Sequence, residues 1–144
     1  MATSKEVRHA GYYMGRLSKD CDLLEALERF CIEKGITLGR VEALGALQKA
    51  RLGYYDQKKR IYRYVELDRN LEVTSLMGNI SLRDGRPMVH AHMTLADREG
   101  KAFGGHLTTG NVVFACEFVI QAFEGAVMER TFDPETDLFL WDLR

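Results

Sequence analysis

The sequence predicts an α/β protein of the α+β type: a curved, mostly antiparallel β-sheet with one main amphipathic helix packed on it. Only one segment, residues 23–34, repeats its apolar residues at helical spacing. Most of the remaining chain consists of short apolar or alternating segments that are separated by turn signals. Because the chain has 144 residues without a repeat or linker, we expect a single domain over residues 1–144.

The helix is predicted from its apolar spacing and from its ends. Its apolar face consists of Leu23, Leu24, Leu27, Phe30 and Cys31. We expect Asp20 to be the N-cap and Gly35 the C-cap, since glycine adopts a positive φ without strain. If Cys21 and Cys31 share this helix, they lie about 15 Å apart, which is too far for a disulfide. With Cys116, these cysteines indicate reduced side chains and a cytoplasmic protein.

The strands follow in chain order, each bounded by a turn signal. They are expected at Tyr12–Met14, Val41–Tyr55 (one strand or two), Ile61–Leu67, Leu71–Leu82, Met88–Ala96, Lys101–Thr108 and Val112–Ile120. Val112–Ile120 and the tail Leu138–Trp141 are apolar on both faces, which indicates burial on both sides. One helix cannot cover that much sheet, so we expect subunit contacts.

The charge and the apolar runs argue against two classes of partner. The net charge is −1 and the pI about 6.4, without the basic excess of most nucleic-acid-binding proteins. The dense basic stretch Lys58–Arg60 is predicted to be a solvated hairpin tip. No apolar run approaches the ~20 residues of a membrane span, and the first residues lack a secretory signal. We therefore expect neither a membrane nor DNA as the main partner.

Three of the four histidines lie within residues 90–106, and strand geometry brings them together. His90 and His92 point to the same face of a strand, because side chains alternate. A three-residue turn at Arg98–Gly100 places His92 opposite His106, so that all three rings share one face. A two-residue turn would instead place His106 on the wrong face, unless a bulge at Gly104-Gly105 restores the register.

The preceding turn, Asp84-Gly85, adds a fourth group to this face. It places Asn79 opposite His90 and Met77 opposite His92. Asn79 is therefore a candidate hydrogen-bond partner behind the histidines, and Met77 a wall of the site.

Three neutral imidazoles on a rigid sheet suit a tetrahedral metal ion with one open position. We predict that His90, His92 and His106 bind Zn2+, although nickel, cobalt, copper or iron also fit nitrogen ligands. The alternative is that the histidines are polar residues on an exposed sheet; His106 in register favours the metal. Affinity is then expected to fall as the pH drops through about 6.5. His9 is interpreted as an ordinary residue.

The chain also resembles a known family, the "plants and prokaryotes conserved" (PPC) domain. The resemblance rests on Leu71–Ile80, on Val89-His90-Ala91-His92 and on Gly104-Gly105-His106-Leu107. It extends from the helix Leu23–Lys34 to the tail Arg130–Leu140. It implies a curved antiparallel sheet with a helix packed against it, a homotrimer, and, in bacterial and archaeal members, zinc on the three matched histidines.

Plant members of the family join this domain to AT-hooks and act on AT-rich DNA, but this sequence departs from them. The hook core Arg-Gly-Arg-Pro is absent, because Asp84–Pro87 lacks its first arginine. The arginine of the plant Gly-Arg-Phe-Glu-Ile-Leu stretch is not matched within Arg69–Thr74 either. DNA binding therefore carries over weakly.

Three functions remain open at this level. The first is a trimeric binding or regulatory module in which zinc braces the sheet or presents an open position to a small anionic ligand. The second is DNA binding, as a transcription regulator. The third is a zinc hydrolase or lyase with Glu117 as general base, although a buried ion pair of Glu117 with an arginine such as Arg51 or Arg63 is the favoured interpretation of this residue. No nucleophile motif or phosphate loop is present, so the balance is against an enzyme.

Overall fold

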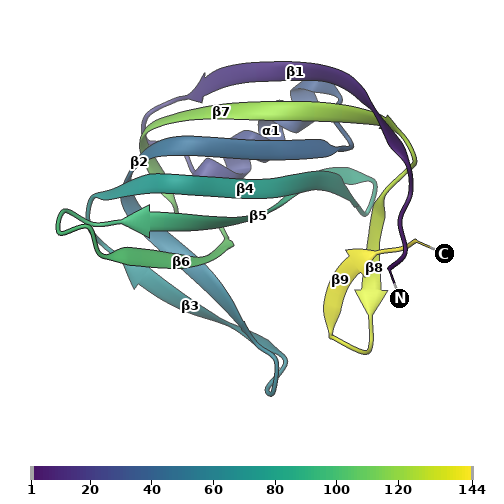
Figure 1. Cartoon of the computed structure of the whole chain (residues 1–144). Helices are drawn as coiled ribbons and strands as arrows, with labels where there is room; N and C mark the ends of the chain where they lie inside the picture. The colour runs from purple at the N-terminus through teal and green to yellow at the C-terminus, as the bar shows by residue number, and fades with distance from the viewer. Residues whose placement is uncertain (1, 144) are drawn as a thin grey trace.

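The computed structural model describes residues 2–143, in which one helix packs against a curved sheet of nine strands (Figure 1). The helix is α1 (Leu23–Lys34). The strands are β1 (Val7–Leu17), β2 (Gly39–Asp56), β3 (Ile61–Leu67), β4 (Leu71–Arg83), β5 (Arg86–Ala96), β6 (Ala102–Leu107), β7 (Val112–Gly125), β8 (Glu129–Asp133) and β9 (Leu138–Trp141). All pairings are antiparallel except the short contact between β4 and β8. The predicted fold class is confirmed.

The sheet closes on itself through the long strand β2. The first half of β2 lies between β7 and β4, and its second half pairs with β3 and, at Leu52 and Gly53, with β6. The bend lies at Gly45, where the register shifts and φ is 150°. A Cβ at Gly45 would lie 2.2 Å from the Ala115 carbonyl oxygen, so only glycine allows β2 and β7 to approach this closely.

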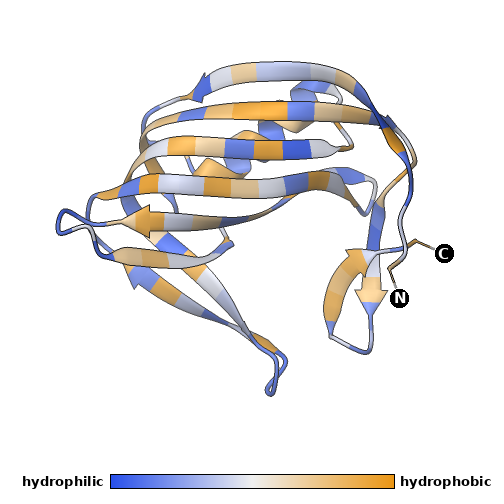
Figure 2. Cartoon of the chain, viewed as in Figure 1, coloured by the Kyte–Doolittle hydropathy of each residue, from blue (hydrophilic) through white to orange (hydrophobic). Residues whose placement is uncertain are grey.

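The core lies between α1 and one face of the sheet. Leu23, Leu27 and Cys31 of α1 are fully buried against alternate residues of the strands. Figure 2 shows the corresponding alternation of hydrophobic and hydrophilic residues along several strands. In β7, the side chain of Val113 is buried, whereas Phe114 is 56% exposed. Within one chain α1 covers only one face of Val112–Ile120, so the predicted burial of its other face requires a second subunit.

The start of the helix also differs from the prediction. Asp22, not Asp20, is the N-cap: its carboxylate accepts hydrogen bonds from the backbone N–H groups of Glu25, Gly110 and Asn111. Asp20 instead has a φ of 68° and accepts a hydrogen bond from Gln48. Cys21 accordingly lies before the helix rather than within it. The C-cap at Gly35 is confirmed, with a φ of 65°.

Both predicted hairpin turns beside the histidines are confirmed. Asp84 and Gly85 have φ values of 53° and 72°, and Gly100 has a φ of 76° as the last residue of its three-residue loop. The strand β8 was not predicted, because its five residues show no clear alternation and its contact with β4 is distant in sequence. Within residues 2–143, no helix is long and apolar enough to span a membrane.

Candidate metal centre

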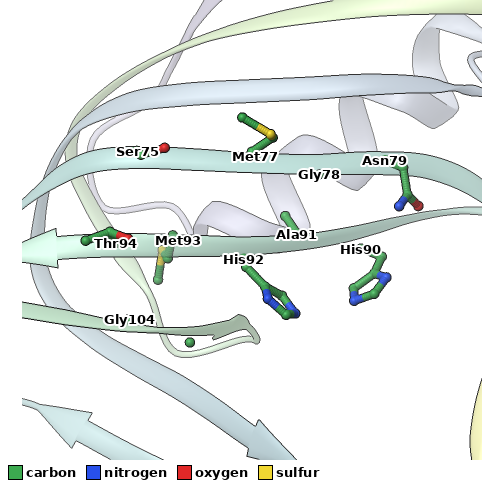
Figure 3. A pocket seen from close by; sticks show the side chains of 11 residues that line it. Ser75, Met77, Gly78, Asn79, His90, Ala91, His92, Met93, Thr94 and Gly104 are labelled. Atoms are coloured by element: carbon green, nitrogen blue, oxygen red, sulfur yellow. The ribbon is translucent and has the colours of Figure 1, made fainter.

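The three predicted histidines converge on the sheet face opposite α1. His90 and His92 extend from β5 and His106 from β6, and one ring nitrogen of each lies within 4.8 Å of the others. Figure 3 shows the rings of His90 and His92 on the same side of β5. The ring centroids are separated by 5.4 Å (His90–His92), 5.1 Å (His90–His106) and 5.4 Å (His92–His106). The triangle is nearly equilateral.

Backbone register produces this arrangement. His92 lies directly opposite His106. Ala91, which lies between His90 and His92 in β5, is buried toward α1. Gly105 allows β6 to lie against β2, because a Cβ there would approach the Gly53 carbonyl oxygen to 2.8 Å. Behind β5, the Glu28 carboxylate of α1 accepts a hydrogen bond from the Val89 N–H at 3.1 Å. The strand that carries two of the histidines is thus held from both the sheet and the helix.

Burial and neighbouring positive charge keep two of these rings neutral. Burial, followed by the charges of Arg130 and the other two histidines, lowers the pKa of His90 to about 4. Burial, His92 and Arg130 also lower the pKa of His106 below its usual range. A neutral imidazole has a free lone pair for a metal ion. At His90, protons therefore compete with a metal only well below the pH of about 6.5 that the sequence suggests.

The donor set fits a divalent transition metal. Zinc–nitrogen bonds of about 2.0–2.1 Å at tetrahedral angles separate ring centres by roughly 5 Å, which matches the triangle of centroids. Among the described residues, the Nδ1 atom of His106 is buried without a hydrogen-bond partner. A buried polar atom without a partner costs about 1–3 kcal/mol, so a bound ion on this ring is a physically reasonable partner.

Asn79 lies opposite His90, as expected, but its side-chain oxygen accepts a hydrogen bond from a residue other than the histidine. Asn79 is opposite His90 in the β4–β5 register. Its Oδ1 atom accepts a hydrogen bond from the Arg130 Nη2 group at 2.8 Å, and the same nitrogen lies 3.3 Å from His90 Nδ1. Sequence reasoning missed Arg130, because it lies on β8 and no spacing pattern relates it to the histidines.

Glu117 lies outside the histidine group. It is exposed, opposite Arg16 of β1, and lines a cavity of about 680 Å3. A second cavity, at His90 and His92, shares Ser75 and Met77 with it. The alternative of a buried ion pair with Arg51 or Arg63 is wrong, because those arginines pair with Glu66 and Asp56. Met77 lines the histidine cavity, as predicted, together with Asn79.

Comparisons with known proteins agree with this architecture. The family model for the Plants and Prokaryotes Conserved (PCC) domain matches residues 4–124. The solved structure of a metal-containing protein from Archaeoglobus fulgidus superimposes with a TM-score of 0.93 over 97% of this chain and 99% of that one, and the two sequences are 40% identical. A plant- and prokaryote-conserved (PPC) protein from Pyrococcus horikoshii is 33% identical, with a TM-score of 0.92 over 98% and 97% of the two chains.

Two further similarities are to proteins with other names. A candidate DNA-binding protein from Bacteroides thetaiotaomicron is 27% identical, with a TM-score of 0.86 over 96% of both chains. A protein named bifunctional protein GlmU, from a Synechococcus strain, is 33% identical over 76% of this chain. The chain spans less than a fifth of the length of that relative and of a second protein of the same name, 17% and 19% respectively.

Metal-free protein is expected to lose stability as the pH falls from about 7 to about 5. Unfolded histidines bind protons near pH 6.5, whereas the folded-state pKa of His90 is about 4. Between these values the unfolded chain binds more protons, so acidification favours unfolding. After allowance for solvent screening, the expected loss from His90 is about 1–2 kcal/mol at pH 5.

Urea unfolding of chelator-treated protein at the two pH values measures this loss. A His90→Gln variant serves as the comparison, since it lacks the titrating ring and should show a smaller pH dependence. An equal pH dependence in the wild type and the variant would contradict the assignment to His90.

Proposed function

The chain belongs to the Plants and Prokaryotes Conserved (PCC) domain family, and we propose that it is a metal-binding member that holds zinc through His90, His92 and His106. The observation that carries the proposal is the convergence of one nitrogen from each ring to within 4.8 Å. The similarity to a metal-containing protein over nearly the whole chain supports it. Nitrogen ligands favour zinc over magnesium or calcium, which prefer oxygen.

The role of the site follows from its ligand count. Three protein ligands leave a tetrahedral ion one position open, and a bound zinc would act there as a Lewis acid toward a small ligand. An open cavity of about 490 Å3 lies at His90 and His92, and its other lining residues include Asn79, Ser75 and Thr94. The positive charge of Arg130 beside His90 favours an anionic ligand. We propose binding of a small anion rather than catalysis, because among residues 2–143 no carboxylate that could act as a general base belongs to the histidine group.

A homotrimer in the cytoplasm completes the proposal. Apolar side chains lie more than half exposed on the neighbouring strands β1, β7, β2 and β4: Tyr12, Met14, Leu44, Met77 and Phe114. A patch of this kind is unusual on a monomer and indicates a contact surface.

The free, buried thiols of Cys31 and Cys116 suit a reducing compartment.

DNA binding is the second candidate, favoured by the relative that is named for it. The charges oppose it. At the predicted basic tip, Arg60 pairs with Asp137, and nearby Arg63 pairs with Asp56. Among the described residues, this leaves Lys58 and Lys59 without an ion pair at the tip of the β2–β3 hairpin. Three chains could gather these lysines, but the net charge of each remains −1.

Untagged protein is expected to carry close to one zinc ion per chain after zinc supplementation. Replacement of His92 or His106 by alanine should remove it, because two imidazoles cannot hold the ion tightly. His9→Ala is the matched control: His9 is exposed and its ring packs at a tilt against Tyr12, so its loss should leave the metal content unchanged. Elemental analysis provides the measurement. Wild-type protein without metal would refute the proposed function.

Sedimentation is expected to show a trimer of the 16.4 kDa chain at micromolar concentration. Met14→Asp should dissociate it, because Met14 is 84% exposed within the apolar patch and a carboxylate there would be buried at the contact. Val127→Asp, a change of an exposed residue outside the patch, is the control. A second variant, Trp141→Asp, tests whether the tail Leu138–Trp141 is also at the contact: if it is, this variant should weaken the trimer. A monomeric wild type would be incompatible with the proposed assembly.

The isolated protein is expected to bind AT-rich duplex only weakly at ~150 mM salt. Non-specific affinity comes chiefly from lysine and arginine contacts to phosphate, and here acidic residues offset them. Fluorescence anisotropy measures the affinity, with a Lys58→Gln/Lys59→Gln variant as the comparison. Sub-micromolar binding by the wild type that this variant abolishes would reverse the ranking of the two functions.

A further inference from the structure

We propose that Arg130 is a positioning residue that competes with the metal ion for His90, so that metal binding releases Arg130 from the histidine ring. The inference rests on the proposed zinc function and adds to it a residue from outside the histidine group. It follows from the direction of one hydrogen bond and from the number of lone pairs on an imidazole.

Arg130 is held in place from several sides. Its side chain extends from β8 and is only 6% exposed. The Nε group donates to Ser81 Oγ at 3.0 Å, and the Nη1 group donates to the Phe139 carbonyl oxygen at 3.1 Å. The Nη2 group donates to Asn79 Oδ1 at 2.8 Å and lies 3.3 Å from His90 Nδ1. Within residues 2–143, no carboxylate lies within ion-pair distance of this guanidinium.

The contact with His90 determines where that ring carries its proton. A guanidinium only donates hydrogen bonds, so His90 Nδ1 is the acceptor. In a neutral ring the proton is then on Nε2. This is the reverse of the usual arrangement at a metal site, where the ring nitrogen that does not bind metal donates its N–H to an oxygen.

Metal binding at His90 is therefore incompatible with the Arg130 contact. If the ion binds Nε2, that proton leaves to solvent and Nδ1 takes one up, so Nδ1 can no longer accept from Arg130. If the ion binds Nδ1, it uses the lone pair to which Arg130 donates. In both cases the hydrogen bond is lost, and the repulsion between two cations adds to the effect.

Asn79 is placed to replace Arg130. Its Oδ1 atom already shares the Nη2 group with His90, and Asn79 lies opposite His90 in register. Once Arg130 withdraws, Oδ1 can accept the Nδ1–H of a metal-bound His90. Because Arg130 also joins Ser81 of β4 to Phe139 of β9, the state of the metal site is linked to the C-terminal hairpin β8–β9.

Zinc affinity, measured by competition with a chelator of known strength, tests the proposal. Arg130→Met should bind zinc about 3- to 10-fold more tightly than the wild type, since it removes the competing donor and charge. Arg83→Met is the matched control. The Arg83 guanidinium carbon lies 3.6 Å from the centre of the Phe139 ring and does not contact the histidines, so the zinc affinity of this variant should equal that of the wild type. Asn79→Ala should bind about 10-fold more weakly. Equal or weaker binding by Arg130→Met would overturn the inference.

A measurement on the wild type does not depend on the folding of a variant. Nitrogen-15 NMR of the imidazoles distinguishes the two tautomers of a neutral histidine. We expect His90 to carry its proton on Nε2 without metal, and to have Nδ1 either protonated or metal-bound with zinc. A metal-free ring protonated on Nδ1, or a zinc-bound ring whose Nδ1 still accepts from Arg130, would overturn the inference alone. No zinc binding by the wild type would overturn both this inference and the proposed function.

Discussion

Cross-strand register between β4, β5 and β6 is the constraint on which the site depends. In a sheet, a slip of one residue moves every side chain to the opposite face. A slip in β6 would exchange His106 for Gly105 beside His92, and a slip in β5 would turn its histidines toward α1. Two tight turns, at Asp84-Gly85 and at residues 98–100, prevent these slips. Their left-handed residues lie far from the metal site but determine whether it exists.

The same register separates a buried face of the sheet from the face that carries the histidines. Helix α1 covers one face and buries Ala91, while the other face carries the histidines and, farther along, exposed apolar residues such as Met14 and Leu44. The histidine group is partly buried by the curvature that brings β6 onto β2. This burial, with the nearby Arg130 charge, keeps the pKa of His90 low and its ring neutral. The curvature that closes the sheet is thus also what keeps His90 neutral and able to bind a metal ion.

The sequence was sufficient for the features that local chemistry controls. The turn residues and the two-residue period of a strand are enough to place His90, His92 and His106 on one face. It was not sufficient for features that depend on distant contacts. Arg130 reaches the site from a strand that pairs with β4 only briefly, and Asp22 became the N-cap because the 110–111 loop also donates to it. The exposure of Glu117 likewise depends on which face α1 covers.

X-ray absorption at the zinc edge tests the central claim, a metal ion on three imidazoles, most directly. For zinc-loaded, untagged protein, the account predicts a first shell of about four nitrogen or oxygen atoms near 2.0–2.1 Å, with the outer scattering of three imidazole rings. His106→Ala should lose the ring signal together with the metal. A first shell with sulfur near 2.3 Å, or one with fewer than three imidazoles, would contradict the account.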